Sequence, residues 1–311
     1  DGNVSLILPI LSVYAIAGIK LLPAFQQIYN SLANIEANIA AFESIEEDLN
    51  DSIKAKLVTK KLEQGYLSPK KQVSLENVTF TYPDKQEPVL NQLNISIPVN
   101  KVIGIVGPSG SGKSTLVDIL LGLIEIKKGC LKVDGTIIDR ANRRLWQNTI
   151  GFVAQAIFLS EGTIAENIAF GIPNNQIDHK KVKKALKLAN LEEFVQALKL
   201  GVDTKVGERG VQLSGGQRQR IGIARALYNE AEVLFFDEAT SSLDGITEKM
   251  IMEAVNEFSG KKTIVMIAHR LKTVEKCDQI FFIDDGKVAD QGTFDELIER
   301  NEKFRNMANH A

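Results

Sequence analysis

The chain has 311 residues, of which 44% are hydrophobic and 24% charged, as is ordinary for globular proteins. This composition excludes a disordered tail or a collagen-like chain, and the length allows about two domains. Its 37 basic and 39 acidic residues give a formal charge of -2, so no overall field would hold it on nucleic acid or on an acidic lipid surface. Cys130 and Cys277 are far apart and lack CxxC spacing, which argues against a zinc site or a disulfide framework and fits a reducing cytosol.

The N-terminal 22 residues are strongly apolar. Gly2 to Ile19 carry no charge, and Val4 to Leu22 contain eleven Val, Ile or Leu residues. On a membrane-insertion scale these eleven contribute roughly -3 to -6 kcal/mol, which favours a membrane helix over the alternative of a buried helix in a soluble domain. A cleaved signal peptide would need a basic start, and Asp1 occupies that place. Because the chain opens with Asp1 rather than Met, we expect it to be part of a longer protein.

Apolar residues after Pro23 recur every three or four positions, as on one face of a helix. They are Leu32, Ile35, Ile39, Phe42, Ile45 and Leu49, with Glu36, Glu43, Glu46, Glu47 and Asp48 between them. We predict that residues 1–49 form one long helix of about 70 Å at 1.5 Å per residue, which could kink at Pro9 or Pro23. We assign it to the C-terminal part of a transmembrane domain, as its last membrane helix with a cytosolic extension. The Lys-rich stretch 50–71 is predicted to be a linker.

From Val73 onward, short strands alternate with helices. Continuous apolar runs bounded by turn residues are typical of strands buried on both faces of an α/β sheet. Such runs occur at Val102–Val106, Val233–Phe236, Ile264–Ile267 and Ile280–Ile283. Because helical spacing replaces this pattern between Gln155 and Leu213, we expect residues 72–311 to form one α/β domain with a helical subdomain at about 156–230.

The segment Gly107–Thr115, GPSGSGKST, fits the phosphate-loop pattern GxxxxGK[ST] and stands between a predicted strand and a predicted helix, as the pattern requires. Its glycines let backbone N–H groups converge on phosphate oxygens at a helix N-terminus that already favours an anion. Lys113 adds a positive charge, and Ser114 adds a hydroxyl ligand for Mg²⁺. The binding residues predicted here are Gly107, Pro108, Ser109, Gly110, Ser111, Gly112, Lys113, Ser114 and Thr115.

Two carboxylates, Asp237 and Glu238, follow the predicted strand Val233–Phe236. A strand that ends in such a pair is common, but the phosphate loop in the same sheet gives it a specific meaning. Asp237 is predicted to hold Mg²⁺ through water. Glu238 is predicted to be the general base that deprotonates the attacking water.

The sequence Leu213–Gln217, LSGGQ, precedes a predicted helix and forms a second N-terminus suited to an anion, although a Ser-Gly-Gly turn alone is more often an ordinary helix cap. In this order the phosphate loop, LSGGQ and Val233–Glu238 resemble the ATP-binding cassette of ABC proteins, over about Val73 to Asn301. The resemblance implies an α/β P-loop NTPase fold, namely a RecA-like core with an antiparallel β edge and a helical subdomain, here preceded by a long N-terminal helix. It also implies that ATP contacts Leu213, Ser214, Gly215, Gly216 and Gln217.

The resemblance assigns roles to further residues. Tyr82 is similar to the aromatic that stacks on adenine, although a tyrosine at a strand end also packs on a sheet. Gln155 is similar to the glutamine that contacts Mg²⁺ and the membrane domain, but it is flanked by alanines where many exporters carry Pro and Asp. Asp244 is similar to a residue that communicates across a dimer, and His269 to the switch histidine at the γ-phosphate. The implied catalytic residues are Glu238, His269, Lys113 and Gln155, and the implied metal ligands are Ser114, Gln155 and Asp237.

The resemblance also indicates the class of transporter. Glu208, in the sequence GERG, resembles the exporter-specific loop that touches the membrane domain, and importer cassettes normally lack both this loop and a fused membrane helix. We expect an exporter half-transporter in a bacterial inner membrane, with its cassette in the cytoplasm and without nucleic-acid partners. Two copies would sandwich ATP and Mg²⁺ head to tail, and Gln155 and Glu208 would contact each copy's own transmembrane domain. The segments Ile164–Phe170 and Asp244–Lys249 most resemble bacterial flippases of lipid-linked oligosaccharides.

Three alternatives stay open at this point. A soluble ABC ATPase of chromosome maintenance would place a long coiled coil between Ser114 and Ser214, which are only 100 residues apart, and one of translation would carry two cassettes. A regulatory module that has lost turnover would not need Glu238 and His269. A heterodimer with one degenerate site is the third alternative, and the intact motifs favour a homodimer instead.

Overall fold

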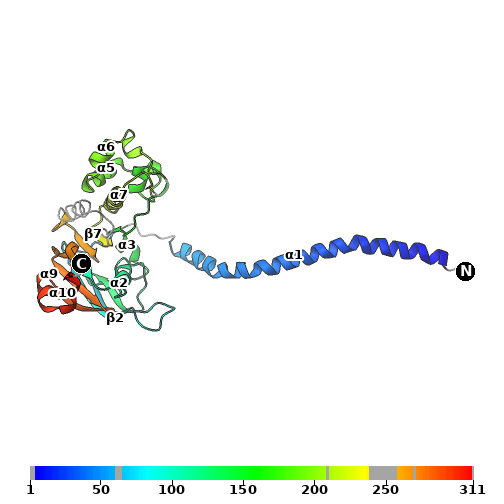
Figure 1. The fold of residues 1–311 in the computed structure, drawn as a ribbon, viewed down its shortest axis with the longest axis horizontal. Helices are drawn as coiled ribbons and strands as arrows, with labels where there is room; N and C mark the ends of the chain where they lie inside the picture. Colours follow the sequence, from blue (N-terminus) through cyan, green and yellow to red (C-terminus); the bar gives the residue numbers. More distant parts are fainter. Residues whose placement is uncertain (1–3, 60–64, 208–209, 238–257, 269–270, 310–311) are drawn as a thin grey trace. The chain divides into compact units, whose positions relative to one another are not determined.

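The computed structural model describes residues 4–59, 65–207, 210–237, 258–268 and 271–309. The chain forms two units, Asp1–Leu62 and Glu63–Ala311 (Figure 1). The first unit is built on a single helix, and the second holds the sheets and the remaining helices.

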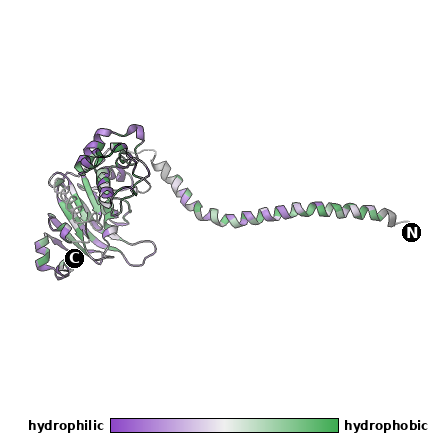
Figure 2. Cartoon of the chain, turned by 45° about the horizontal axis from the view of Figure 1, so that its top comes forward, coloured by the Kyte–Doolittle hydropathy of each residue, from purple (hydrophilic) through white to green (hydrophobic). Residues whose placement is uncertain are grey.

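Helix α1 (Val4–Thr59) has 56 residues and is about 84 Å long at 1.5 Å per residue. It continues through Pro9 and Pro23. The helix ends ten residues beyond the predicted end at 49, so that part of the predicted linker is helical, because no Gly or Pro interrupts residues 50–59. The predicted division into membrane part, linker and cassette stays a prediction. The part of α1 from Ile7 to Glu43 is long and apolar enough to cross a membrane, judged by length and composition. Figure 2 shows that hydrophobic residues are frequent toward its N-terminus.

The second unit contains two sheets. One is antiparallel with the strand order β2-β1-β4-β5, and the other has the order β10-β9-β3-β8-β7-β6. In the larger sheet, neighbouring strands from β9 to β6 run parallel and β10 is an antiparallel edge, which confirms the predicted α/β core. The strands are β1 Gln72–Phe80, β2 Leu90–Pro98, β3 Val102–Val106, β4 Lys128–Val133, β5 Thr136–Ile137, β6 Ile150–Val153, β7 Val233–Asp237, β8 Thr263–Ile267, β9 Gln279–Asp284 and β10 Lys287–Gly292.

The central strands β3, β8 and β7 of the larger sheet are almost entirely apolar because both faces of the sheet are covered there, whereas the edge strand β10 is mostly polar. Along β7, Val233 and Phe235 pack with residues of α2 and of the antiparallel sheet, whereas Leu234 and Phe236 pack with residues of α4, α5 and α7. Each fully buried side chain of this size contributes about 1.5–3 kcal/mol. The two clusters therefore fix the position of the sheet, and with it the loops at the ends of its strands.

Helices replace strands between β6 and β7, as predicted, and Figure 1 shows α5, α6 and α7 gathered in one group. The helices there are α4 Ile164–Ile168, α5 His179–Leu188, α6 Glu192–Gln196 and α7 Gly215–Tyr228, with 3-10 turns at Asn174–Gln176 and Gly201–Asp203. The other helices of this unit are α2 Lys113–Leu120, α3 Arg143–Gln147, α9 Phe294–Arg300 and α10 Glu302–Asn309, with a 3-10 turn at Leu271–Val274.

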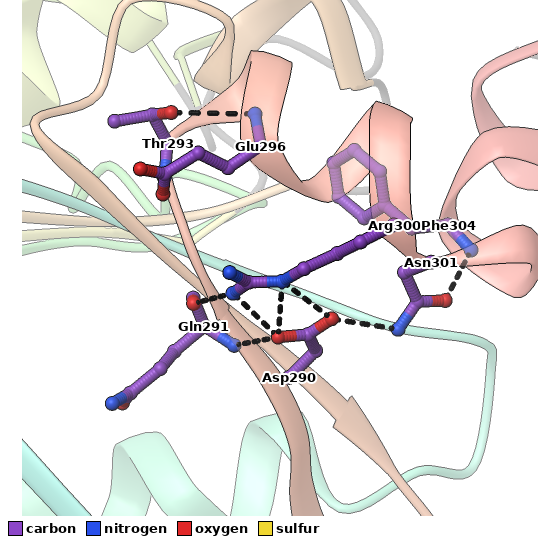
Figure 3. A network of polar contacts seen from close by, with 7 residues as sticks. All are labelled: Asp290, Gln291, Thr293, Glu296, Arg300, Asn301 and Phe304. Atoms are coloured by element: carbon purple, nitrogen blue, oxygen red, sulfur yellow. Dashed lines mark hydrogen bonds and ion pairs between the residues drawn. The ribbon is translucent and has the colours of Figure 1, made fainter.

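A polar network closes the C-terminal end of the second unit (Figure 3). Arg300 donates from Nε and Nη2 to Asp290 Oδ1 at 3.1 and 2.7 Å, and Asn301 Nδ2 donates to Asp290 Oδ2 at 3.2 Å. Although partial burial raises the pKa of Asp290, these hydrogen bonds lower it overall. The N–H of Phe304 donates to Asn301 Oδ1 at 3.0 Å, and its fully buried ring packs edge-on to Phe282, so the last helices belong to the core of the unit.

Candidate nucleotide-binding site

The phosphate loop runs from the end of β3 to the start of α2. Two of its glycines are required by what surrounds them. A Cβ at Gly107 would lie 2.1 Å from the carbonyl oxygen of Ile283, and one at Gly112 would lie 2.8 Å from Leu90 Cδ2. Gly112 also has a φ of +99°, which L side chains rarely adopt. The loop can therefore curl closely around the N-terminus of α2, whose first N–H groups have no partner within the helix.

The side chain of Lys113 lies inside this loop. Its Nζ donates to the carbonyl oxygens of Gly107 at 2.8 Å and Pro108 at 2.9 Å, and the side chain is only 5% exposed. The buried hydroxyl of Ser111 has no hydrogen-bond partner within the described residues. An ammonium, a hydroxyl and a helix N-terminus in one loop form a donor set that fits phosphate oxygens.

A cavity of about 240 Å³ lies over the loop. Tyr82 lines it, half-buried, and its hydroxyl is 3.1 Å from Thr115 Oγ1. The ring of Phe80 holds that of Tyr82 edge-on, with centroids 4.9 Å apart. The full lining is Tyr82, Lys85, Val89, Ser109, Gly110, Gly112, Lys113, Ser114 and Thr115. The structure thus brings together the predicted aromatic and the loop, and adds Lys85 and Val89, which sequence reasoning missed. A basic residue three positions after Tyr82 was the available signal for Lys85.

The remaining predicted site residues follow the carboxyl ends of strands in the same parallel sheet. Asp237 is the last residue of β7 and pairs in register with Ile267 of β8, which in turn neighbours β3. Gln155 lies two residues beyond the end of β6 and is exposed. Since carboxyl ends of parallel strands share one edge of a sheet, both residues lie on the edge that carries the phosphate loop. Glu238, His269, Asp244 and Glu208 lie outside the described residues.

The LSGGQ sequence forms the N-terminus of α7. Ser214 is the N-cap, and its hydroxyl accepts a hydrogen bond from the N–H of Gln217 at 3.2 Å, while Gln217 Oε1 accepts one from the N–H of Ser214 at 2.8 Å. Leu213 is buried, whereas Ser214 and Gly215 are exposed. In the described part of the chain, none of these residues lines the cavity over the phosphate loop. The predicted contact between LSGGQ and ATP stays a prediction.

Asn167 is a residue of this region whose role sequence reasoning missed. It is fully buried, and its Oδ1 accepts a hydrogen bond from the N–H of Ser160 at 2.9 Å while its Nδ2 donates to the carbonyl oxygens of Ser160 and Thr163 at 3.0 Å each. Arg225 of α7 donates to the carbonyl oxygen of Asn167 at 2.8 Å. Asn167 therefore ties the segment that follows Gln155 to the helix that begins with LSGGQ.

The fold and the loop define a P-loop nucleotide-binding domain with a second capped helix N-terminus, and comparison with known proteins agrees. Residues 90–241 match the family described as "ABC transporter". The "ATP-dependent lipid A-core flippase" of Saccharophagus degradans is 38% identical over 295 residues, which cover 95% of this chain and 49% of that protein. The protein of the same name from Escherichia coli K12 is 40% identical over 227 residues, which cover 73% of this chain and 39% of that protein.

A solved structure described as a bacterial Atm1-family ABC exporter with ATP bound has a TM-score of 0.72 and 32% sequence identity, and the match covers 86% of this chain and 48% of that one. This chain therefore spans about half the length, or less, of the relatives it matches. Residues 90–241 match the ABC transporter family, and the chain resembles ABC exporters that include lipid flippases. The match of residues 90–241 to this family implies that they bind ATP.

Proposed function

We propose that this chain is the ATP-binding and ATP-hydrolysing part of an ABC exporter or flippase, with α1 in the membrane and the cassette in the cytoplasm. The observation that carries the proposal is the closely packed phosphate loop, with Lys113 inside it and Tyr82 beside it, in a chain that matches a lipid flippase along 95% of its length. The names of the relatives favour a lipid as the transported substrate. The predicted lipid-linked oligosaccharide belongs to this class of substrate. A bacterial inner membrane is the proposed location.

The proposed chemistry assigns one task to each group. The N–H groups of the loop and the ammonium of Lys113 bind phosphate oxygens, and Tyr82 packs on the adenine. Oxygen atoms of Ser114, Gln155 and Asp237 suit Mg²⁺, which, when bound, neutralises charge on the phosphates. Glu238 accepts a proton from the attacking water, which His269 helps to orient against the γ-phosphate. The roles of Glu238 and His269 are those that the sequence predicts.

We further propose that two copies of the chain form a head-to-tail dimer. In each site the phosphate loop of one copy and LSGGQ of the other enclose one ATP, and Asp244 communicates between the two sites. Support comes from the cavity over the phosphate loop, whose lining residues in the described ranges include none from Leu213–Gln217. Gln155 and Glu208 are proposed to pass the movement of the cassettes to each copy's own transmembrane domain.

Hydrolysis and membrane association together test this function. The 311-residue chain in detergent should hydrolyse ATP only with Mg²⁺, and Lys113→Ala should abolish the activity. Tight ATP binding without turnover would instead identify a regulatory module. A soluble ABC ATPase is the alternative function, and it predicts that the chain stays in the aqueous phase when liposomes are floated, whereas we expect it to float with them.

A further inference from the structure

The residues from Gly65 to Gln72, at the start of β1, are held on the surface of the cassette by hydrogen bonds. We call these residues the strap. The carbonyl oxygen of Gly65 accepts a hydrogen bond from Asn148 Nδ2 at 3.0 Å, and the N–H of Leu67 donates to the carbonyl oxygen of Leu145 at 3.0 Å. Both partners lie in or directly after α3. The upstream part of the strap is therefore attached to α3.

The downstream part of the strap has a separate anchor. Asp134 accepts hydrogen bonds from the N–H groups of Lys70, Lys71 and Gln72 at 2.6, 2.8 and 2.9 Å. Pro69, between the two anchors, is buried. A segment held at both ends cannot act as a free tether, so a force on it reaches the elements to which it is bonded.

Helix α3 in turn holds the far end of the phosphate-loop helix. Trp146 is fully buried and its Nε1 donates to the carbonyl oxygen of Leu120 at 2.8 Å. Gln147 Nε2 donates to the carbonyl oxygens of Leu121 at 3.3 Å and Gly122 at 3.2 Å. The last carbonyls of a helix have no partner within it, so these two side chains supply partners at the C-terminus of α2.

Helix α2 connects this clamp to the site. It has eight residues and is about 12 Å long, so a shift at its C-terminus reaches the phosphate loop at its N-terminus. We infer that α3 couples the strap to the phosphate loop, with Trp146 and Gln147 as positioning residues for the loop. Binding of nucleotide and displacement of the strap then influence each other, since coupling between two sites is reciprocal. This inference rests on the proposed nucleotide binding.

Amide hydrogen exchange of the strap tests the coupling in the full chain in detergent, with Mg²⁺ and AMP-PNP as the nucleotide. We expect nucleotide to slow exchange in the peptide that contains Leu67 by about threefold to tenfold. In Gln147→Leu, which removes the donor to Leu121 and Gly122 but leaves the bond from Trp146 to Leu120, nucleotide should still bind and this slowing should be weaker. Equal slowing in both proteins, or none in the unsubstituted chain that has bound AMP-PNP, overturns the inference.

The reverse direction uses a milder pair of variants. Asn148→Ala releases the strap at Gly65, and we expect the Kd for a fluorescent ATP analogue to rise about threefold or more. Asn94→Ala is the matched control, because it removes an amide on β2 that likewise donates to a backbone carbonyl, that of Gln92 at 2.9 Å, and that also bonds to Asn77. Equal Kd values for Asn148→Ala and Asn94→Ala overturn the inference. This comparison does not depend on whether Gln147→Leu folds. Absence of analogue binding to the unsubstituted chain contradicts the proposed function instead.

Discussion

Lys113→Ala and Ser214→Ala damage two parts of the proposed site, and mixing the two variants shows whether those parts serve one ATP within a single chain. In a head-to-tail dimer each site combines Lys113 of one copy with Ser214 of the other. Both homodimers therefore have two damaged sites. A mixed dimer has one site with both lesions and one with neither. ATP hydrolysis should return when the two inactive preparations exchange subunits.

The expected sizes follow from the contacts. Lys113 makes hydrogen bonds of 2.8 and 2.9 Å inside the loop, and two charge-assisted bonds to phosphate at about 1.5–3 kcal/mol each correspond to a rate loss of about 10²- to 10⁴-fold. Ser214→Ala removes an N-cap, at a cost of about 1 kcal/mol, which the buried face of α7 should tolerate. Equal mixing gives about half mixed dimers, so activity should recover to about a quarter of that of the unsubstituted protein.

The assay measures phosphate release after incubation of the two variants, each with its own affinity tag. A pull-down through one tag, probed for the other, shows that subunits exchanged. If mixed dimers form but hydrolysis does not recover, then it is wrong that each site combines Lys113 of one copy with Ser214 of the other and works independently. Each variant alone should stay folded, with a cooperative thermal transition, since otherwise the loss of activity would have a trivial cause.

Four further predictions concern single changes. Glu238→Gln should keep ATP binding but slow hydrolysis by about 10²-fold or more, because an amide cannot accept the proton, and turnover at the normal rate would remove Glu238 from its role. A chain that begins at Gly65 should be soluble without detergent and bind ATP, and its unfolding on this truncation would show that α1 belongs to the core. Trp146→Ala should lower the free energy of unfolding by about 3–5 kcal/mol in denaturant titrations, since the ring is fully buried, and a loss under 1 kcal/mol would contradict that burial. Asp134→Asn should destabilise the cassette by about 1–2 kcal/mol near neutral pH. Burial raises the pKa of Asp134, three backbone N–H groups lower it, and the net effect is a decrease. The ionised carboxylate therefore stabilises the fold at pH values above the ordinary range of carboxyl pKa values. That stabilisation is lost as pH falls through the folded-state pKa, so the two proteins should converge in acid, and a constant difference would exclude this carboxylate as the cause.

The sequence predicts those parts of the fold and site that depend on local pattern. The run Val233–Phe236 predicts β7, because a strand buried on both faces must be apolar throughout. The glycines of the phosphate loop predict its shape, since Gly107 and Gly112 stand where a Cβ would collide with other atoms. The end of α1 is less predictable, because residues 50–59 have weak periodicity, contain no Gly or Pro and include a run of good helix formers only at Lys54–Leu57.

Contacts between distant segments could not be predicted in the same way. Asn148 bonds to Gly65 across 83 residues, and Trp146 bonds to Leu120 across 26. Each partner is a backbone carbonyl, which every residue has, so no residue type marks it in the sequence. The same holds for Asn167, whose amide is satisfied by backbone groups of Ser160 and Thr163.

The order of strands in the larger sheet also sets the order of events during synthesis of the chain. Strand β3 lies between β8 and β9, so that Ile103 pairs with Val265 and Gly104 with Ile280. At about 5–20 residues per second, a ribosome needs roughly 10–30 s to reach these partners after β3 has been made. Until then β3, apolar on both faces, has no neighbours in its sheet, and Gly107 has no Ile283 against which to pack. The phosphate loop is therefore synthesised early, but the strands that support it are synthesised late. The nascent cassette needs protection from aggregation over that interval.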